Sequence, residues 1–328
     1  MSAEQLKRLW IETGRAGAEK LYDKAIKSGL VVSRKQAQEF VKSQAEAQVF
    51  QPRARSDGKV VATGPLITWQ VDVMNFTQFS TKGNGGFRFV VVAVDVFDRT
   101  MRTAPMKTKT PEEAAKVFRA FAPFPVEVDT DHGNEWGGAF QRLLDSKGIG
   151  HREKDPKQLN ALAVVDRAIG TLRSILAKDM TARGSANWYP ALKGATRAYN
   201  NTGHSHLMGS EPTDVANSKE LTYELRVRAG EDIQHNANVY DANAAALRNA
   251  GAFRTMMPRN TWARAHQPSW DNVVHKVSRI DGSDVIDEDG QRFPVNLVLP
   301  VSAASTAAAA PIELRGADLF GMPSRSVL

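Results

Sequence analysis

The stretch Ile67-Thr68-Trp69-Gln70-Val71-Asp72-Val73 marks the point where the pattern of the chain changes from helical to extended. Upstream, apolar residues recur at helix-like spacing, whereas here β-branched and aromatic residues form the kind of run that is typical of a buried strand. Asp72 lies inside this apolar run, where an unpaired charge is costly. Its position therefore indicates a side chain with a specific partner or a chemical role.

The segments that follow decide the fold class. Strand candidates at 67–75, 87–97 and 100–106 form a meander, and helical and extended segments alternate after it. This order predicts an α/β protein with one mixed sheet. The remaining candidates are helices at 110–121, 138–147, 160–180 and 187–200, and strands at 125–130 and 149–153.

The N-terminal segment predicts a separate helical module. Residues 1–50 carry apolar positions at helical spacing, with Ser33 as an expected N-cap, and residues 51–65 form a polar linker rich in helix breakers. Residues 1–64 hold 12 Lys and Arg against 7 Asp and Glu. We expect a helix-turn-helix-like module with a basic surface; a helical packing appendage is the alternative.

The C-terminal third predicts a second small domain. Residues 217–265 are expected to be a helical linker. Asp-Gly pairs at 281–282 and 289–290 are hairpin signals between short apolar runs, so residues 266–301 predict a small β-barrel. The tail at 302–328 has scattered glycine, proline and alanine and is expected to be disordered.

Composition limits the classes of function. The 328 residues carry a net charge of +7 with a sequence pI of about 9.5, which favours a polyanionic partner. The chain has no cysteine, so neither disulfides nor a thiolate zinc site can form. The longest apolar stretch, at 89–96, contains Asp95 and is too short to span a membrane.

Two further acids occupy positions comparable to that of Asp72. Asp131 ends the run Val-Glu-Val-Asp-Thr-Asp at 126–131, and Asp166 lies within the helical pattern that begins at 160. Two acids at strand ends and one on a helix can converge on a pair of hard divalent cations, which prefer oxygen ligands. Such a pair of ions can hold the attacking and leaving oxygens of a phosphoryl transfer.

Five blocks, spanning about 66–216, resemble the catalytic core of retroviral and retrotransposon integrases. Trp-Gln-Val-Asp at 69–72 is similar to the first acidic strand, and Asp-Val-Phe-Asp-Arg at 95–99 to the block that usually reads Asp-x-Phe-Ser-Arg. Thr-Asp-His-Gly-Asn-Glu-Trp at 130–136 is similar to Thr-Asp-x-Gly-x-Glu-Phe, which holds the second acid. The last two blocks are 160–173, which resembles the helix of the third acid, and 199–204 with Glu211 and Pro212.

This resemblance implies an RNase H-like fold for 66–216, with a mixed five-stranded sheet flanked by helices, and an SH3/chromo-like barrel for 266–301. It also implies that Asp72, Asp131 and Asp166 hold two Mg²⁺ or Mn²⁺ ions, with Asp72 bridging both. The expected reaction is 3′-end trimming of the DNA of a mobile element and its strand transfer into target DNA. The N-terminal segment more closely resembles Maverick/Polinton integrases.

Other acids compete for two of the three positions. Asp129 lies two residues before Asp131, so both point to one face of a strand, and Gly133 favours Asp131 because the family block has glycine there. Glu153 and Asp155 are rivals of Asp166 in a charged loop. For a lone aspartate at a strand end, a turn or cap residue is the plain alternative. Glu135, in the same sequence block as Asp131, is expected to be a hydrogen-bonding partner rather than a ligand.

The chain departs from the family in its third acid, which is Asp166 where glutamate is usual, and in the 34 residues between Asp131 and Asp166, where the retroviral pattern has 35. The N-terminus also has no His/Cys zinc pattern. A domesticated or weakened integrase that binds DNA or protein is therefore the alternative function, and a nuclease of the same fold is a third.

The expected partner is double-stranded DNA, bound by a homo-oligomer, dimer or tetramer, with no membrane involved and in the nucleus of a eukaryotic host. Arg173 lies seven residues after Asp166 and so on the same helix face. The expected DNA-binding residues are Arg173, Lys157, Gln158, Lys276 and Arg279, the last two beside Trp270 on the barrel. Solvated charges and a core tryptophan are the plain alternative there.

Overall fold

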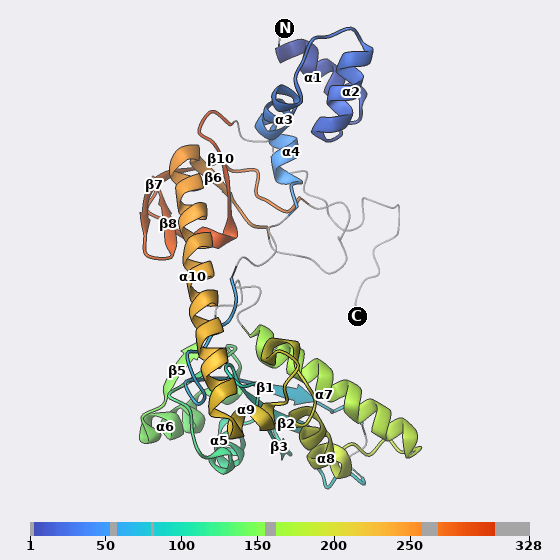
Figure 1. Cartoon of the computed structure of the whole chain (residues 1–328), viewed down its shortest axis with the longest axis vertical. Coiled ribbons are helices and arrows are strands. Elements are labelled where there is room, and N and C mark those ends of the chain that lie inside the picture. The colour runs from blue at the N-terminus through green and yellow to red at the C-terminus, as the bar shows by residue number, and fades with distance from the viewer. Residues whose placement is uncertain (1–2, 53–57, 80–81, 155–161, 258–267, 306–328) are drawn as a thin grey trace, which may run out of the picture. The chain divides into compact units, whose positions relative to one another are not determined.

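The computed structural model describes residues 3–52, 58–79, 82–154, 162–257 and 268–305. The chain forms two compact units (Figure 1). One, here called the core unit, is Gly58–Ala237, and the other, the terminal unit, combines Met1–Asp57 with Asn238–Leu328. No helix in the described part of the chain is long and apolar enough to cross a membrane.

The core unit is built on a mixed sheet of five strands in the order β3-β2-β1-β4-β5. Strands β1 (Thr68–Asn75), β2 (Phe89–Asp95) and β3 (Met101–Met106) form the predicted antiparallel meander. Strand β4 (Glu127–Thr130) runs parallel to β1, and β5 (Gly150–Glu153) runs parallel to β4. The predicted α/β class with one mixed sheet is confirmed.

Helices cover both faces of this sheet (Figure 1). Alternate residues of β2 point to opposite faces, so Val91 packs with the helix pair α5 and α6, whereas Val92 packs with α7 and α8. The helices are α5 (Pro111–Phe118), α6 (Gly138–Lys147), α7 (Ala163–Ala182), α8 (Tyr189–Asn200) and α9 (Pro212–Asn217). Short 3-10 turns occur at Arg119–Phe121, Asn134–Trp136 and Ser205–Leu207.

Asp95, the acid of the second family block, has a structural role at the end of β2. Its carboxylate accepts hydrogen bonds from the indole Nε1 of Trp69 at 3.1 Å and from the backbone nitrogen of Leu66 at 2.7 Å. Since Asp95 is buried, these bonds stabilise its charge and fix the entry of the chain into β1.

The N-terminal part of the terminal unit is helical, as predicted. Helices α1 (Ala3–Glu12), α2 (Ala18–Lys27) and α3 (Arg34–Ser43) pack around a small apolar core, and α4 (Ala45–Val49) follows α3. Ser33 is the N-cap of α3: its hydroxyl accepts from the backbone of Gln36, whose side chain accepts from the backbone of Ser33. This capping box explains why the helix begins there.

The C-terminal part contains a second antiparallel sheet, in the order β10-β6-β7-β8-β9. Its apolar core contains Phe253 and Val285. The strands are β6 (Gly251–Thr255), β7 (His275–Asp281), β8 (Asp284–Asp287), β9 (Arg292–Pro294) and β10 (Val298–Ser302), with a 3-10 turn at Val295–Leu297.

The helical linker is shorter than the expected 217–265. Helix α10 (Lys219–Ala250) ends where Gly251 adopts a φ of +72°, a conformation that glycine accepts without strain and that commonly ends a helix. The next residues form β6, so the second sheet begins before the expected 266 and extends to Ser302. The expected disordered tail lies, from residue 306 onward, outside the described residues.

A buried arginine connects the N-terminal helices to the C-terminal sheet within the terminal unit. Arg254 on β6 is fully buried, and its Nε donates to the side chain of Gln48 in α4 at 3.0 Å. Its Nη1 donates to the backbone oxygens of Asp271 and Asn272 at 3.1 and 2.6 Å. The segment around α4 thus packs with the C-terminal sheet, which the expected boundary at residue 50 did not anticipate.

Candidate active site

The register of β1 and β4 brings Asp72 and Asp131 together. These parallel strands pair Gln70 with Asp129. Two residues further along each strand, Asp72 on β1 and Asp131 just after β4 lie at the same level and on the same face. Neighbouring strands are only about 4.8 Å apart, so the two carboxylates lie at one edge of the sheet.

Asp131 is held by hydrogen bonds to one of its oxygens. Its Oδ1 accepts from the indole Nε1 of Trp136 at 2.7 Å and from the backbone nitrogen of Gly133 at 3.1 Å. Trp136 is fully buried against Phe140, so the indole forms a rigid support beneath an exposed carboxylate. The other oxygen of Asp131 receives no hydrogen bond from the described residues and remains available for a ligand.

The turn after Asp131 explains the glycine and the glutamate of its sequence block. Glu135 folds back over Gly133, where a Cβ would lie 2.6 Å from Glu135 Oε1. The Glu135 carboxylate is buried and lies 2.8 Å from the Nζ of Lys109, in the loop between β3 and α5. Glu135 is thus an ion-pair partner of a lysine, in keeping with the structural role expected for it.

Asp166 lies in the first turn of α7, and the start of this helix is attached to β1. The side-chain oxygen of Gln70 accepts hydrogen bonds from the backbone nitrogens of Val164 and Val165 at 3.0 and 3.2 Å. Gln70 precedes Asp72 by two residues and points to the same face. One side chain therefore satisfies helix N–H groups that would otherwise lack partners, and it brings the third acid toward the first.

The electrostatics of the three acids are coupled. Burial above all, together with the charges of Asp131 and Asp166, raises the pKa of Asp72 to about 6, against the opposing effects of the Val73 backbone N–H and Lys109. Burial and Asp131 likewise raise the pKa of Asp166, whereas Arg173 opposes the change. The charge of Asp131 thus acts on both Asp72 and Asp166, which agrees with three carboxylates that lie near one another.

The donor set suits a hard divalent cation, because it consists of carboxylate oxygens alone. Val73 donates to Asp72 Oδ1 at 2.6 Å, and the described residues make no hydrogen bond to Asp72 Oδ2 or to the carboxylate of Asp166. Within the described ranges, however, no three or more Asp, Glu or His side chains are arranged around a single ion position. The three carboxylates therefore fit such an ion in chemistry, and binding it would require them to move closer together.

The rival acids have other partners. Asp129 is fully buried and its two oxygens contact Arg152 at 2.8 and 3.1 Å and Lys154 at 3.2 Å. Glu153 contacts the imidazole Nδ1 of His132 at 2.7 Å. The two cations compensate the charge of Asp129, and the carboxylate of Glu153 is engaged by His132, so both rival acids already have partners. Asp155 lies outside the described residues.

The expected DNA-binding residues lie on different parts of the molecule. Arg173 is exposed on α7, close enough to influence Asp166, and Lys276 and Arg279 are exposed on β7 of the terminal unit. Lys276 contacts Glu288 at 3.5 Å. The remaining two, Lys157 and Gln158, lie outside the described residues.

Trp270 does not belong to a stacking surface beside Lys276 and Arg279. It is buried, 3% exposed, and its indole nitrogen donates to the backbone oxygen of Gln51 at 2.9 Å. A buried indole cannot stack on a base, so the core alternative is correct for this residue.

Sequence reasoning missed two residues of the site, Gln70 and Lys109. Gln70 had a usable signal, because a residue two positions before a strand acid shares its face. Lys109 had none, since its partner is 26 residues away along the chain.

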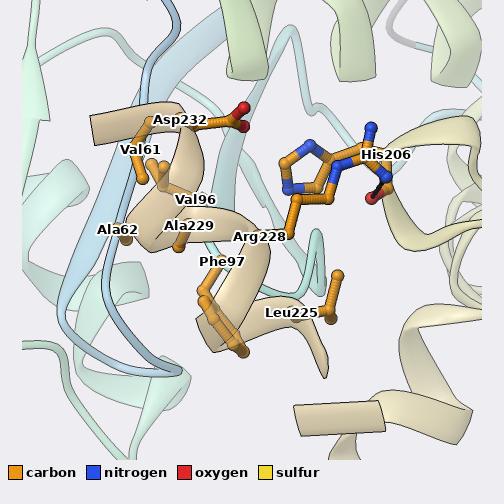
Figure 2. Close-up of a pocket in the computed structure, with 9 residues that line it drawn as sticks. All are labelled: Val61, Ala62, Val96, Phe97, His206, Leu225, Arg228, Ala229 and Asp232. Carbon is orange, nitrogen blue, oxygen red and sulfur yellow. Dashed lines mark hydrogen bonds between the residues drawn. The ribbon is translucent and has the colours of Figure 1, made fainter. Parts of the chain in front are cut away.

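A small pocket lies elsewhere in the core unit and contains none of the three acids (Figure 2). Its volume is about 10 Å³, the size of one water molecule. Among its lining residues are His206, Arg228 and Asp232, and Lys59 pairs with Asp232 at 2.5 Å. Burial, followed by the charges of Arg99 and Arg228, lowers the pKa of His206 to about 4. The pocket marks where residues 61–62 and α10 pack within the core unit, rather than a second substrate site.

Comparison with known proteins agrees with this architecture. No family model matches the chain. A transposon-derived protein of Caenorhabditis elegans, itself uncharacterized, is 24% identical over 207 residues, which make up 60% of this chain and 72% of that protein. A chain of the cryo-EM structure of the simian T-cell lymphotropic virus intasome in complex with PP2A regulatory subunit B56 gamma aligns with a TM-score of 0.62. That match covers 91% of this chain and 99% of the viral chain, at 16% identity.

Two structures of the HTLV-2 integrase catalytic core in complex with magnesium, in trimeric and dimeric forms, match at TM-scores of 0.38 and 0.39. Both are 20% identical; they cover 46% and 49% of this chain and 96% and 99% of theirs. The match to the intasome chain shows that this chain has a similar fold, in agreement with the fold expected from the sequence blocks. In sequence, the chain resembles a transposon-derived protein.

Proposed function

We propose that the chain is the integrase of a mobile element and joins the 3′ ends of element DNA to target DNA by metal-dependent phosphoryl transfer. The observation that carries this proposal is that the register of β1 and β4 brings Asp72 and Asp131 together and that Gln70 attaches the helix of Asp166 to β1, in an integrase-like fold. The chemistry needs no covalent enzyme intermediate, so the absence of cysteine is no obstacle.

Asp72, Asp131 and Asp166 would together hold the divalent ions, two Mg²⁺ or Mn²⁺. When bound, such ions activate a water or a DNA 3′-hydroxyl and stabilise charge on the leaving oxygen. The contribution of the chain is to orient the ligands. Trp136 and Gly133 fix one oxygen of Asp131, and Gln70 holds the helix that carries Asp166.

The substrate would be double-stranded DNA, which the net charge of +7 favours. Arg173 lies on the same helix as Asp166 and would contact DNA near the reacting phosphate, together with Lys157 and Gln158. Lys276 and Arg279, on the terminal unit, would contact other DNA phosphates. Because two DNA ends must be joined in concert, a dimer or tetramer of the chain would act, in the nucleus of a eukaryotic host.

A strand-transfer assay with Mn²⁺ tests the proposal. The donor is an oligonucleotide duplex that copies the ends of the element encoding the chain, and the target is a supercoiled plasmid. We expect joining by the unmodified protein and a loss of at least about a hundredfold with Asp72→Asn or Asp166→Asn. Asp179→Asn, an exposed acid on the same helix, is the matched control and should join normally.

Joining at equal rates by Asp72→Asn and the unmodified protein would exclude the assigned site. A protein that binds DNA without joining it would instead be a domesticated or weakened integrase, and the shorter side chain of Asp166 at the third position favours this alternative. Cleavage of RNA–DNA hybrids without joining would identify a nuclease of the same fold.

A further inference from the structure

Glu135 is a buried carboxylate whose charge depends on one cation. Its side chain is 3% exposed, whereas that of its partner Lys109 is 43% exposed. Within the described part of the chain no hydrogen bond of good geometry reaches Glu135 Oε1, which lies 2.8 Å from Lys109 Nζ. A buried charge is stable only when it is compensated, so the two side chains depend on each other.

Each member of this pair also acts on one of the three acids. Glu135 fills the space above Gly133, and the backbone nitrogen of Gly133 donates to Asp131. Lys109 influences Asp72 through its positive charge, which favours the ionised carboxylate. The pair is therefore linked to both acids of the sheet, to Asp131 through the turn at Gly133 and to Asp72 through the charge of Lys109.

We propose that Lys109 and Glu135 form a positioning pair, in which Glu135 keeps the ammonium of Lys109 away from the carboxylate oxygens that bind a divalent cation. The inference rests on the proposed function of the same site. An ammonium group released beside three carboxylates pairs with them and competes with the metal, because opposite charges attract strongly in a partly buried site. Neither residue is a ligand, and Glu135 acts through Lys109.

The pairing predicts an unusual order of variants. Glu135→Gln keeps the shape of the side chain but releases Lys109, and we expect Mn²⁺ affinity to fall at least about fivefold. Adding Lys109→Met to Glu135→Gln removes the released charge, so affinity should return to within about twofold of the unmodified protein. A purely structural role for the pair predicts the opposite, with the double variant no better than the single one.

The measurement is calorimetric titration of the full chain with Mn²⁺ alone, with thermal unfolding in the absence of metal to compare folding. Glu39→Gln, which breaks the exposed Lys35–Glu39 pair at 3.9 Å, is the matched control and should leave affinity unchanged. Should Glu135→Gln fail to fold, the double variant serves, because it leaves neither charge unpaired, with affinity expected within about twofold of the unmodified protein. A larger loss of affinity in the double variant would overturn the proposal.

Two failures can be told apart with Asp72→Asn. If this variant binds Mn²⁺ as well as the unmodified protein, the proposed metal site itself is wrong. If Asp72→Asn loses Mn²⁺ binding while Glu135→Gln binds as well as the unmodified protein, or if the double variant is as weak as Glu135→Gln, the positioning role is wrong while the proposed function stands.

Discussion

The side-chain oxygen of Gln70 lies 3.0 Å from the backbone nitrogen of Val164. This hydrogen bond connects the strand that carries Asp72 to the helix that carries Asp166. Helix N-termini need acceptors for their first N–H groups, and here a buried strand residue supplies one. The attachment of the third acid thus depends on a neutral side chain.

Replacing Gln70 with leucine should loosen the start of α7. The variant keeps the approximate volume but leaves the N–H groups of Val164 and Val165 without their acceptor, so local opening should become easier by about 1–2 kcal/mol. Hydrogen exchange of residues 162–170, read by mass spectrometry, measures this. Gln38→Leu at an exposed position of α3 is the control, and unchanged exchange in Gln70→Leu would contradict the capping role.

Stability in the absence of metal should depend on pH through Asp72. Its folded pKa of about 6 lies above the ordinary 3.8, so the folded chain binds a proton more tightly than the unfolded chain. The stabilising contribution is therefore complete at low pH and is lost as pH rises from about 4 through about 6. Asp166 has the same sign.

Asp72→Asn should remove this loss and stabilise the metal-free protein at pH 7 by up to about 3 kcal/mol. Denaturant unfolding of the unmodified and variant proteins at acidic and neutral pH tests the sign. A variant that is less stable than the unmodified protein at neutral pH would show that Asp72 has a compensating partner.

The turn after Asp131 should be intolerant of even one added methyl group. In Gly133→Ala the new Cβ would lie 2.6 Å from Glu135 Oε1, so the glutamate or the turn must shift, at a cost of about 1–3 kcal/mol. Gly137→Ala is the matched control, because the nearest atom there is 3.8 Å away. Thermal unfolding compares the two, and equal effects would argue against close packing at residue 133.

The terminal unit should bind DNA mainly through Arg279. Lys276 already contacts Glu288 at 3.5 Å, and no such ion pair involves Arg279 within the described residues. We expect Arg279→Gln to weaken DNA binding more than Lys276→Gln does. It should also reduce the slope of the logarithm of the binding constant against the logarithm of the salt concentration by about one, because one phosphate contact is lost. Fluorescence anisotropy with duplex DNA between about 50 and about 200 mM salt measures both quantities. Equal slopes in all three proteins would exclude this surface.

Local sequence patterns predicted the order of the elements well. The meander, the alternation after it and the capping box at Ser33 all follow from side-chain spacing over a few residues. The main error was a domain boundary: the helical linker was expected to include residues 251–257, although the glycine at 251 permits the positive φ that ends α10, and β6 begins there.

The sequence by itself determined the fold class and singled out three candidate acids, because strand and helix periodicity and the spacing of the blocks are local properties of the chain. Only the tertiary structure decided what surrounds those acids. Lys109 meets Glu135 and Gln70 meets Val164, each across a long separation in sequence. Such contacts arise from how distant segments pack, and buried charges and helix ends then require partners that no local pattern specifies.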